Sequence, residues 1–352
     1  MKPEQHQIVF HNNIKASVHS IEELHSKSMN NWQGWWCSAG IRHLNISFDG
    51  IVYKGTCREG GPLGSIYDRS MANGSIKLLE WILCNKNSCS CGPDMRATKV
   101  LNKSDIAMVT SDKMTSPDFD ALEQVDLVTD PTVVYCGLYS EHKQVIWEIG
   151  RRCNYDCWYC NPGIHNNYES QKSLGSLLHA YHHLMRIWGK KDKIKFTFAG
   201  GESTFNPDYL EFVQYLRSQG HIIHTTTNGS HTANYYSQLM LVSDISFSAH
   251  LSYLETPNIM KKFVANIAAA QASKISTPST NKHILEVRIM LQPGKLELAM
   301  NLYTTLKEII NNVTVDLLRD REGKIIPYSK EELDWAMGAI DIAKQPLPEL
   351  RK

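Results

Sequence analysis

The sequence predicts an α/β fold, a partial (β/α)₆ TIM-like barrel preceded by a small cysteine-rich module that contains a β-hairpin. From about residue 146 onward, six short apolar runs alternate with segments of helical periodicity, an arrangement typical of parallel sheets covered by helices. The alternating region spans about 185 residues, which suits six βα units better than the eight of a complete barrel. A doubly wound open sheet would show the same alternation, so periodicity leaves it as an alternative.

The predicted strands and helices of this region follow one another in order. Strands are expected at residues 145–149, 194–199, 221–227, 244–249, 285–291 and 313–318. Apolar residues spaced by three or four predict helices over residues 174–188, 210–216, 259–267 and 302–310. Gly220 is expected to end the second of these helices. A capping box from Ser329 to Glu332 predicts a closing helix.

The N-terminal part has a different pattern. Residues 43–55 form two alternating runs around Asp49-Gly50, which predicts a β-hairpin with a type I′ turn. Residues 76–84 are expected to be helical, and the polar residues 111–132 are expected to be a linker. The predicted boundaries are therefore a cysteine-rich module over 1–100, a linker or wrapping segment over 101–142, the barrel over 143–325, and a C-terminal helix and tail over 326–352.

Charge and hydropathy exclude two classes of partner. The 37 basic and 36 acidic residues leave a formal net charge of +1, and without a long basic run we expect no nucleic-acid binding. The N-terminus lacks an apolar core of signal-peptide length, and no window approaches the ~20 apolar residues of a membrane span. We therefore expect a cytoplasmic protein that does not bind membranes. In that reducing compartment its nine cysteines are expected to be metal ligands or buried thiols.

The cysteines fall into two groups, which predict two metal sites. Only Cys136 stands apart from both groups. The second group is Cys153, Cys157 and Cys160, and the first is Cys37, Cys57, Cys84, Cys89 and Cys91.

The second group follows directly on the first predicted strand of the barrel, where barrel enzymes place their chemistry. Three thiolates on a four-iron cluster would leave one iron open for another molecule. A zinc site completed by a fourth ligand such as His165 is the alternative. The position in the barrel favours the cluster.

The spacing Cys153-xxx-Cys157-xx-Cys160, with Tyr159 before the last cysteine, resembles the motif of the radical S-adenosylmethionine superfamily. The runs "FAGGEST", "TTTNG" and "SFSAH" follow in order at the ends of the next three predicted strands and resemble further motifs of that family. The resemblance covers roughly residues 143 to 320. It implies that the three cysteines hold a [4Fe-4S] cluster and that S-adenosyl-L-methionine binds the fourth iron. It also implies reductive cleavage to a 5′-deoxyadenosyl radical, which abstracts hydrogen from an unactivated C–H bond.

The resemblance also implies roles for individual residues. Gly200, Gly201 and Glu202 match the motif that holds the methionine amine, although Ser203-Thr204 follow where many members carry proline. His250 stands where many relatives carry an acid. Arg288 either faces the methionine carboxylate or forms a salt bridge at the barrel edge. The remaining positions implied to border the cofactor are Tyr159 near adenine, Asn228 beside the same pocket, and Ser246 and Ser248 near ribose or the carboxylate.

Residues 35 to 96 resemble the auxiliary iron–sulfur modules called SPASM and twitch domains, in which cysteines flanking a hairpin join downstream cysteines around a second cluster. Here the module precedes the barrel instead of following it, and five cysteines are present for four irons. A zinc knuckle is the alternative. Cys136 is interpreted either as a hydrogen donor to a substrate radical or as a small buried apolar residue.

The family and its auxiliary modules favour peptide modification, by oxidative cross-linking or epimerisation, as the function. Oxidation or rearrangement of a small metabolite is the alternative within the family, and a zinc-stabilised binding protein without turnover is the alternative outside it. The expected partners are a peptide or small-molecule substrate and a small electron-transfer protein of the flavodoxin or ferredoxin type. The sequence does not name the substrate.

Overall fold

The computed structural model describes residues 5–10, 16–20, 30–41, 43–68, 80–89, 92–95, 97–106, 133–137, 142–160, 163, 165–189, 192–276, 283–320 and 325–339. These residues divide into two compact units. The first contains the described residues up to Ile46 and from Ile51 to Gln144, and the second contains Ser47–Gly50 and those from Val145 onward. Each unit is described by itself.

A mostly parallel sheet forms the centre of the second unit, which confirms the predicted α/β class. Its strands lie in the order β15-β14-β13-β12-β11-β10, and parallel pairing joins β11 through β15. The bounds are β10 Lys143–Glu148, β11 Ile194–Ala199, β12 Ile222–Thr227, β13 Asp244–His250, β14 Leu285–Leu291 and β15 Val313–Leu317.

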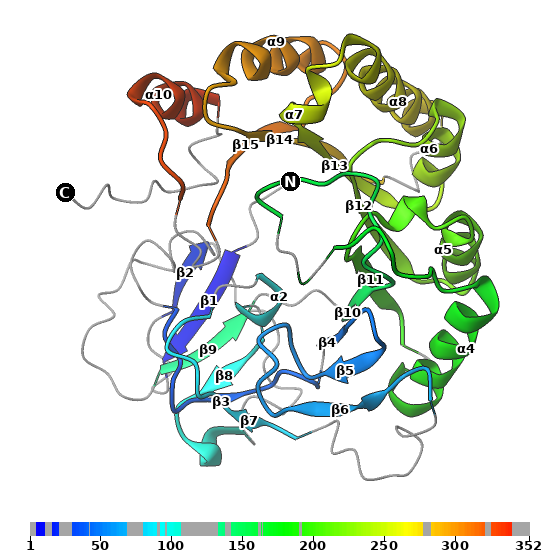
Figure 1. The fold of residues 1–352 in the computed structure, drawn as a ribbon. Helices are drawn as coiled ribbons and strands as arrows, with labels where there is room; N and C mark the ends of the chain where they lie inside the picture. Colours follow the sequence, from blue (N-terminus) through cyan, green and yellow to red (C-terminus); the bar gives the residue numbers. More distant parts are fainter. Residues whose placement is uncertain are drawn as a thin grey trace. The chain divides into compact units, whose positions relative to one another are not determined.

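Helices cover one face of this sheet (Figure 1). The predicted helices are confirmed as α4, α5, α8, α9 and α10, and two short ones, α6 and α7, were not predicted. Gly220 follows α5 with φ +87°, as a C-terminal cap requires. The capping box is also confirmed, because Ser329 and Glu332 exchange side chain-to-backbone hydrogen bonds of 2.7 and 3.2 Å. The bounds are α4 Leu174–Leu184, α5 Tyr209–Ser218, α6 Ala233–Met240, α7 Leu251–Leu254, α8 Pro257–Ser276, α9 Leu296–Lys307 and α10 Lys330–Ala339.

Alternation along each strand separates an apolar face from a polar one, because successive side chains point to opposite faces of a sheet. Trp147, Phe196 and Phe198 are fully buried on the helix-covered face. There Trp147 packs edge-on against Phe212 of α5, with ring centroids 5.6 Å apart. The opposite face carries polar residues at the alternate positions, among them Lys195, His224, Ser246, Glu286 and Arg288.

The first unit contains an antiparallel sheet with strand order β2-β1-β9-β8-β3-β7. Strands β4, β5 and β6 pair antiparallel with one another, and a short helix α2 (Gly92–Met95) precedes β8. The bounds are β1 Gln5–Phe10, β2 Ala16–Ser20, β3 Trp36–Cys37, β4 His43–Ile46, β5 Ile51–Tyr53, β6 Pro62–Ser65, β7 Ile82–Leu83, β8 Lys99–Val100 and β9 Val133–Gly137.

Two local predictions in this region are corrected. The hairpin β4–β5 exists, but a type I′ turn needs positive φ at both central residues, and of the pair only Gly50 has it, at +87°. The amide of Gly50 instead donates to Ser47 O at 2.8 Å across a longer loop. The helix expected over 76–84 is wrong at Ile82–Leu83, which pair with β3 as a strand. Residues 76–79 lie outside the described residues.

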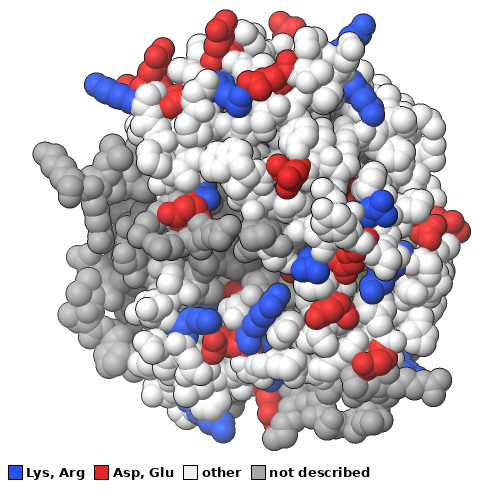
Figure 2. Space-filling model, viewed as in Figure 1, with Lys and Arg blue, Asp and Glu red and all other residues white. Residues whose placement is uncertain are grey.

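Within the expected linker over 101–142, the described residues include β9, which pairs with β1 and β8. Among the described residues, no helix combines the length and the apolar character needed to cross a membrane. Figure 2 shows basic and acidic side chains interspersed among the described residues of the face in view.

We expect Phe196→Ala to lower the free energy of unfolding by about 3–5 kcal/mol, because it leaves a cavity in the aromatic core between sheet and helices. Urea unfolding monitored by tryptophan fluorescence measures the change. Ile275→Ala is the matched control, since 74% of Ile275 is exposed and exposed substitutions usually stay within about 0.5 kcal/mol. Equal midpoints for the two variants would contradict this packing.

Candidate functional site

The three cysteines of the second group lie in the loop that follows β10. Residues 150–160 of this loop are called the cysteine loop below. The amide of Cys153 donates to Asn166 O at 3.2 Å, and the amide of Asn166 donates to Arg151 O at 2.8 Å. Farther along, the amide of Cys160 donates to Cys157 O at 2.9 Å, which closes a turn. Backbone hydrogen bonds therefore hold both the start of the loop and the turn that carries its last two thiols.

These thiols are buried enough to stay protonated at neutral pH, and a bound metal would replace their protons and hold them as thiolates. Burial raises the pKa of Cys153 to about 11 and that of Cys157 to about 12. The amide of Tyr155 points at Cys153 Sγ, 3.4 Å away, and such a donor stabilises a thiolate. The donor set thus fits an iron–sulfur cluster.

Among the described residues, no group of three or more His, Cys, Asp or Glu side chains is placed to hold one metal ion. The cysteines of a four-iron cluster bind different irons, so they need not converge on a single point as zinc ligands must. His165, the fourth zinc ligand considered above, lies with its Nε2 3.2 Å from Asp156 Oδ1.

Aromatic residues at the end of β13 and in α7 hold the cysteine loop. The ring of Tyr155 stacks on that of Tyr253 at 3.8 Å with an interplanar angle of 4°, and the amide of Asp156 donates to the Tyr253 hydroxyl. His250 Nδ1 lies 2.5 Å from the Tyr159 hydroxyl. Burial lowers the pKa of His250 to about 4, so its ring is neutral at neutral pH. His250 was noted in the sequence only as a departure from the family pattern.

The two glycines after β11 allow a close backbone contact with the start of the cysteine loop. The amide of Gly201 donates to Gly150 O at 3.0 Å, and the amide of Glu202 donates to Arg152 O at 2.9 Å. A Cβ atom added to Gly200 would lie 2.2 Å from Gly150 O, and one added to Gly201 would lie 2.3 Å from Arg152 O. Real Cβ atoms do not approach this closely, so this contact requires glycine at both positions.

The Glu202 carboxylate is buried and collects donors from two strand ends. Its Oε1 accepts from the Thr204 hydroxyl at 2.6 Å and from the Thr227 hydroxyl at 2.8 Å. Its Oε2 accepts from the amide of Asn228 at 2.6 Å. Burial raises the pKa of this carboxyl, and the hydrogen bonds from Thr204, Asn228 and Thr227 oppose that rise. Glu202 therefore ties the end of β11 to the end of β12.

Asn228 extends this connection to the cysteine loop, because its Nδ2 donates to Asn154 Oδ1 at 2.9 Å. The structure thus brings together three segments that the sequence singled out separately, namely the cysteine loop, residues 200–202 and residues 228–229. All three lie at the carboxyl ends of neighbouring strands, where α/β enzymes bind their ligands.

Two other predicted positions are joined to each other through Glu286, on the polar face of the sheet. Ser246 Oγ donates to Glu286 Oε1 at 2.6 Å, and Arg288 Nη2 donates to the same oxygen at 3.0 Å. Burial raises the pKa of Glu286, but the Arg288 charge and the Ser246 hydroxyl outweigh it and hold the pKa below its usual value. Of the two roles considered for Arg288, this geometry favours the salt bridge. Ser248 lies opposite Arg288 in the strand register.

Described cysteines of the first group come together in the first unit. Cys37 pairs through β3 with Ile82 and Lys99. Cys84 lies near enough to Cys37 to add to the rise of its pKa, and Cys37 does the same for Cys57. Burial raises the pKa of Cys37 and of Cys57. The amide of Cys89 donates to Asn30 O at 2.8 Å. Cys91 lies outside the described residues.

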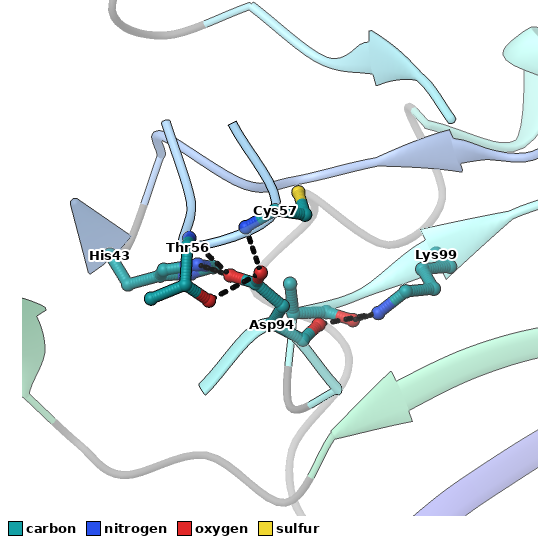
Figure 3. A network of polar contacts seen from close by, with 6 residues as sticks. His43, Thr56, Cys57, Asp94 and Lys99 are labelled. Carbon is teal, nitrogen blue, oxygen red and sulfur yellow. Dashed lines mark hydrogen bonds and ion pairs between the residues drawn. The ribbon is translucent and has the colours of Figure 1, made fainter. Parts of the chain in front are cut away.

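Asp94 of α2 fixes the backbone beside Cys57 (Figure 3). Its Oδ2 accepts from the amide of Cys57 and from the Thr56 hydroxyl, each at 2.6 Å, and its Oδ1 lies 2.7 Å from His43 Nε2. The Asp94 carbonyl accepts from Lys99 Nζ at 2.7 Å. Asp94 therefore joins β4 to the Cys57 loop through its buried carboxylate and contacts β8 through its backbone carbonyl, a role that the run "CGPD" did not reveal.

Cys136 lies in β9, where its backbone is opposite Gln7 of β1. Its side chain is outside the described part of the structure. Both interpretations of Cys136 stay predictions.

The family model with the description "Radical SAM superfamily" matches residues 147–249. The chain contains a radical SAM domain. The matched range runs from β10 through the cysteine loop and residues 200–202 to the end of β13. The family implies a [4Fe-4S] cluster and S-adenosylmethionine as cofactors. A comparison with curated proteins finds no match.

Among solved structures, the chain is similar to SuiB from Streptococcus suis. For SuiB bound to S-adenosylmethionine, the identity is 9%, the similarity covers 55% of this chain and 46% of SuiB, and the TM-score is 0.39. For SuiB bound to the precursor peptide SuiA, the identity is 12%, the coverage is 67% of this chain and 57% of SuiB, and the TM-score is 0.41. The chain therefore spans about half of SuiB's length.

We expect Gly201→Ala to destabilise the contact that holds the cysteine loop, because the added Cβ would lie 2.3–2.6 Å from the backbone of Arg151 and Arg152. Overpacking of this kind costs about 1–3 kcal/mol or more, so both the unfolding midpoint and the iron bound after reconstitution should fall. Gly175→Ala in α4 is the matched control, since nothing lies within 4 Å of its added Cβ. Wild-type iron binding by the Gly201→Ala variant would contradict the contact.

We expect Asp94→Asn to destabilise the first unit at neutral pH. Burial raises the pKa of Asp94, but His43, Thr56 and the Cys57 amide outweigh burial and lower the pKa from 3.8 to about 2. A depressed pKa means that the carboxylate stabilises the fold above about pH 4 and that this contribution is lost as the pH falls toward 2, amounting to about 2 kcal/mol. Urea midpoints at pH 7 and pH 2.5 test this.

The wild type should be more stable than Asp94→Asn at pH 7, and the gap should shrink at pH 2.5. Glu211→Gln, at an exposed position on α5, controls for loss of a surface charge. A gap independent of pH would show that the Asp94 charge contributes nothing.

Proposed function

We propose that this chain is a radical S-adenosylmethionine enzyme in which Cys153, Cys157 and Cys160 hold a [4Fe-4S] cluster at the mouth of a partial six-unit barrel. One observation carries the proposal. The cysteine loop is tied by backbone and side-chain hydrogen bonds to residues 200–202 and to Asn228. Thiols for a cluster and a carboxylate for a cationic amine thus share one edge of the sheet.

The residues around the loop have distinct tasks in this proposal. The amide of Tyr155 stabilises the Cys153 thiolate, and Tyr253 holds the loop backbone through Asp156. Glu202 Oε2 accepts from the Asn228 amide, and because a carboxylate oxygen can accept more than one hydrogen bond, it can also receive the methionine ammonium. When bound, the cluster and S-adenosylmethionine together supply the 5′-deoxyadenosyl radical that takes hydrogen from an unactivated C–H bond.

We propose that four of the five N-terminal cysteines hold a second, auxiliary cluster. The proximity of Cys37, Cys57 and Cys84 supports it, with Cys89 or Cys91 as the fourth ligand. A cluster saturated by four thiolates has no iron open for S-adenosylmethionine, but it can carry electrons or support the fold. Asp94 would position the Cys57 ligand. A SPASM- or twitch-like module is the form we propose for this region.

The pairing of a radical domain with a second cysteine group supports peptide modification, by oxidative cross-linking or epimerisation, as the reaction. The charged face of the sheet favours a second candidate, the oxidation or rearrangement of a small polar metabolite. Glu286 and Arg288 lie on that face as an ion pair and could orient such a substrate. A flavodoxin- or ferredoxin-type donor and a cytoplasmic location complete the proposal, since reduced thiols persist there.

Anaerobic reconstitution with iron and sulfide, followed by strong reduction with S-adenosylmethionine, tests this function. The wild type should form 5′-deoxyadenosine, and replacing Cys153, Cys157 and Cys160 together by Ala should abolish it and lower the bound iron. Tyr168→Ala is the control, because this residue is 94% exposed near the same loop. Bound zinc without iron, or no 5′-deoxyadenosine from the wild type, would refute the proposal.

A second arm of the same experiment tests the auxiliary cluster. Replacing Cys37 and Cys84 by Ala in the triple variant should remove its remaining iron. The same two replacements in the wild type should leave the triad cluster able to cleave S-adenosylmethionine. Iron content unaffected by the N-terminal replacements would remove the auxiliary cluster and leave the radical chemistry in place.

A further inference from the structure

Two side chains from different segments meet at the sulfur of Cys157. His250 Nδ1 lies 3.4 Å from Cys157 Sγ, and the Tyr159 hydroxyl lies 2.5 Å from the same nitrogen. Burial raises the pKa of Cys157, and the nearby Tyr159 hydroxyl opposes that rise. The three polar atoms therefore form a small triangle.

The positions of the protons in this triangle follow from the charge on the sulfur. The inference rests on the proposed function, in which Cys157 is an iron-bound thiolate and carries no proton. If His250 Nδ1 were bare, its lone pair would face that negative sulfur at 3.4 Å, and the Tyr159 hydroxyl would point at the ring. If Nδ1 carries the ring proton, it donates to the Tyr159 oxygen, and the Tyr159 O–H is left to donate to the thiolate. Of these two arrangements, only the second gives the thiolate a donor from Tyr159.

We propose that Tyr159 donates a hydrogen bond to the Cys157 thiolate, that His250 orients this hydroxyl, and that the pair raises the reduction potential of the cluster. Reduction adds negative charge to the cluster, so a donor on a ligand sulfur stabilises the reduced state more than the oxidised one. In this role His250 is a positioning residue, and the side chain of Tyr159 does more than pack against adenine.

The surrounding contacts hold this chain of donors in place. The Tyr159 and His250 rings are nearly parallel, with an angle of 12° and centroids 5.9 Å apart. The ring of Tyr155 meets His250 edge-on at 5.8 Å and stacks on Tyr253. Because β13 and α7 supply His250 and Tyr253 while the loop supplies the other rings, the geometry does not depend on a single flexible segment.

An EPR-monitored redox titration of the reconstituted full-length protein tests the inference. The signal of the triad cluster is identified by its change when S-adenosylmethionine is added. Tyr159→Phe keeps the ring and removes the hydroxyl, so the midpoint potential should become more negative. His250→Phe keeps the ring stack and removes the orienting nitrogen, so the potential should shift in the same direction by a smaller amount.

Tyr155→Phe is the matched control, since it removes a hydroxyl from the same loop and keeps the stack on Tyr253. Its midpoint should equal that of the wild type. An unchanged or more positive potential in Tyr159→Phe, or an equal shift in Tyr155→Phe, would overturn the inference while leaving the proposed function intact. If Tyr159→Phe fails to retain its cluster, His250→Phe decides by the same criterion. A wild-type protein without any signal that responds to S-adenosylmethionine would overturn both.

Discussion

The contact between the backbone of residues 200–202 and that of residues 150–152 is the constraint on which the candidate site depends. Two amides donate to two carbonyls across it, at a separation that leaves no room for a Cβ on Gly200 or Gly201. Because the cysteine loop begins at this point, the contact sets where its thiols lie relative to the strand ends. The buried Glu202 carboxylate then fixes the end of β12 next to this contact, because it accepts hydrogen bonds from Thr227 and Asn228.

A buried carboxylate has a comparable structural role in each unit. Glu202 and Asp94 each accept hydrogen bonds from a backbone amide and from a threonine hydroxyl. Their electrostatics differ, because burial dominates at Glu202 and raises its pKa, whereas His43 and the other donors lower that of Asp94. In both places a buried carboxylate joins separate chain segments by accepting their hydrogen bonds.

Much of the fold was predictable because the strands and helices of the second unit are long and strongly periodic. The wrong predictions fall in segments that are too short to show a periodic pattern. Ile82–Leu83 became a strand through pairing with β3, and the four residues of α7 are too few to show a period. The turn after β4 depends on φ at Asp49, which composition does not determine. Tertiary contacts decided these local conformations.

The candidate site was predictable in its motifs but not in its connections. Cys153, Cys157, Cys160 and Glu202 were found from spacing and family resemblance, and their ligand roles stay proposals. The partners that shape the site are far away in sequence, as with His250, which is 93 residues from Cys157. His43 is likewise 51 residues from Asp94. No local pattern reports such pairs, so they required the three-dimensional structure.

In the proposed function, Cys153, Cys157 and Cys160 would hold a cluster with one iron left for S-adenosylmethionine, and Glu202 would receive the methionine ammonium. Electron–nuclear double resonance on the reduced protein, with S-adenosylmethionine labelled with ¹⁵N at its amine, tests this most directly. We expect a ¹⁵N coupling to the cluster that is lost when Cys153, Cys157 and Cys160 are replaced. A reduced cluster in the wild-type protein that shows no ¹⁵N coupling would contradict it.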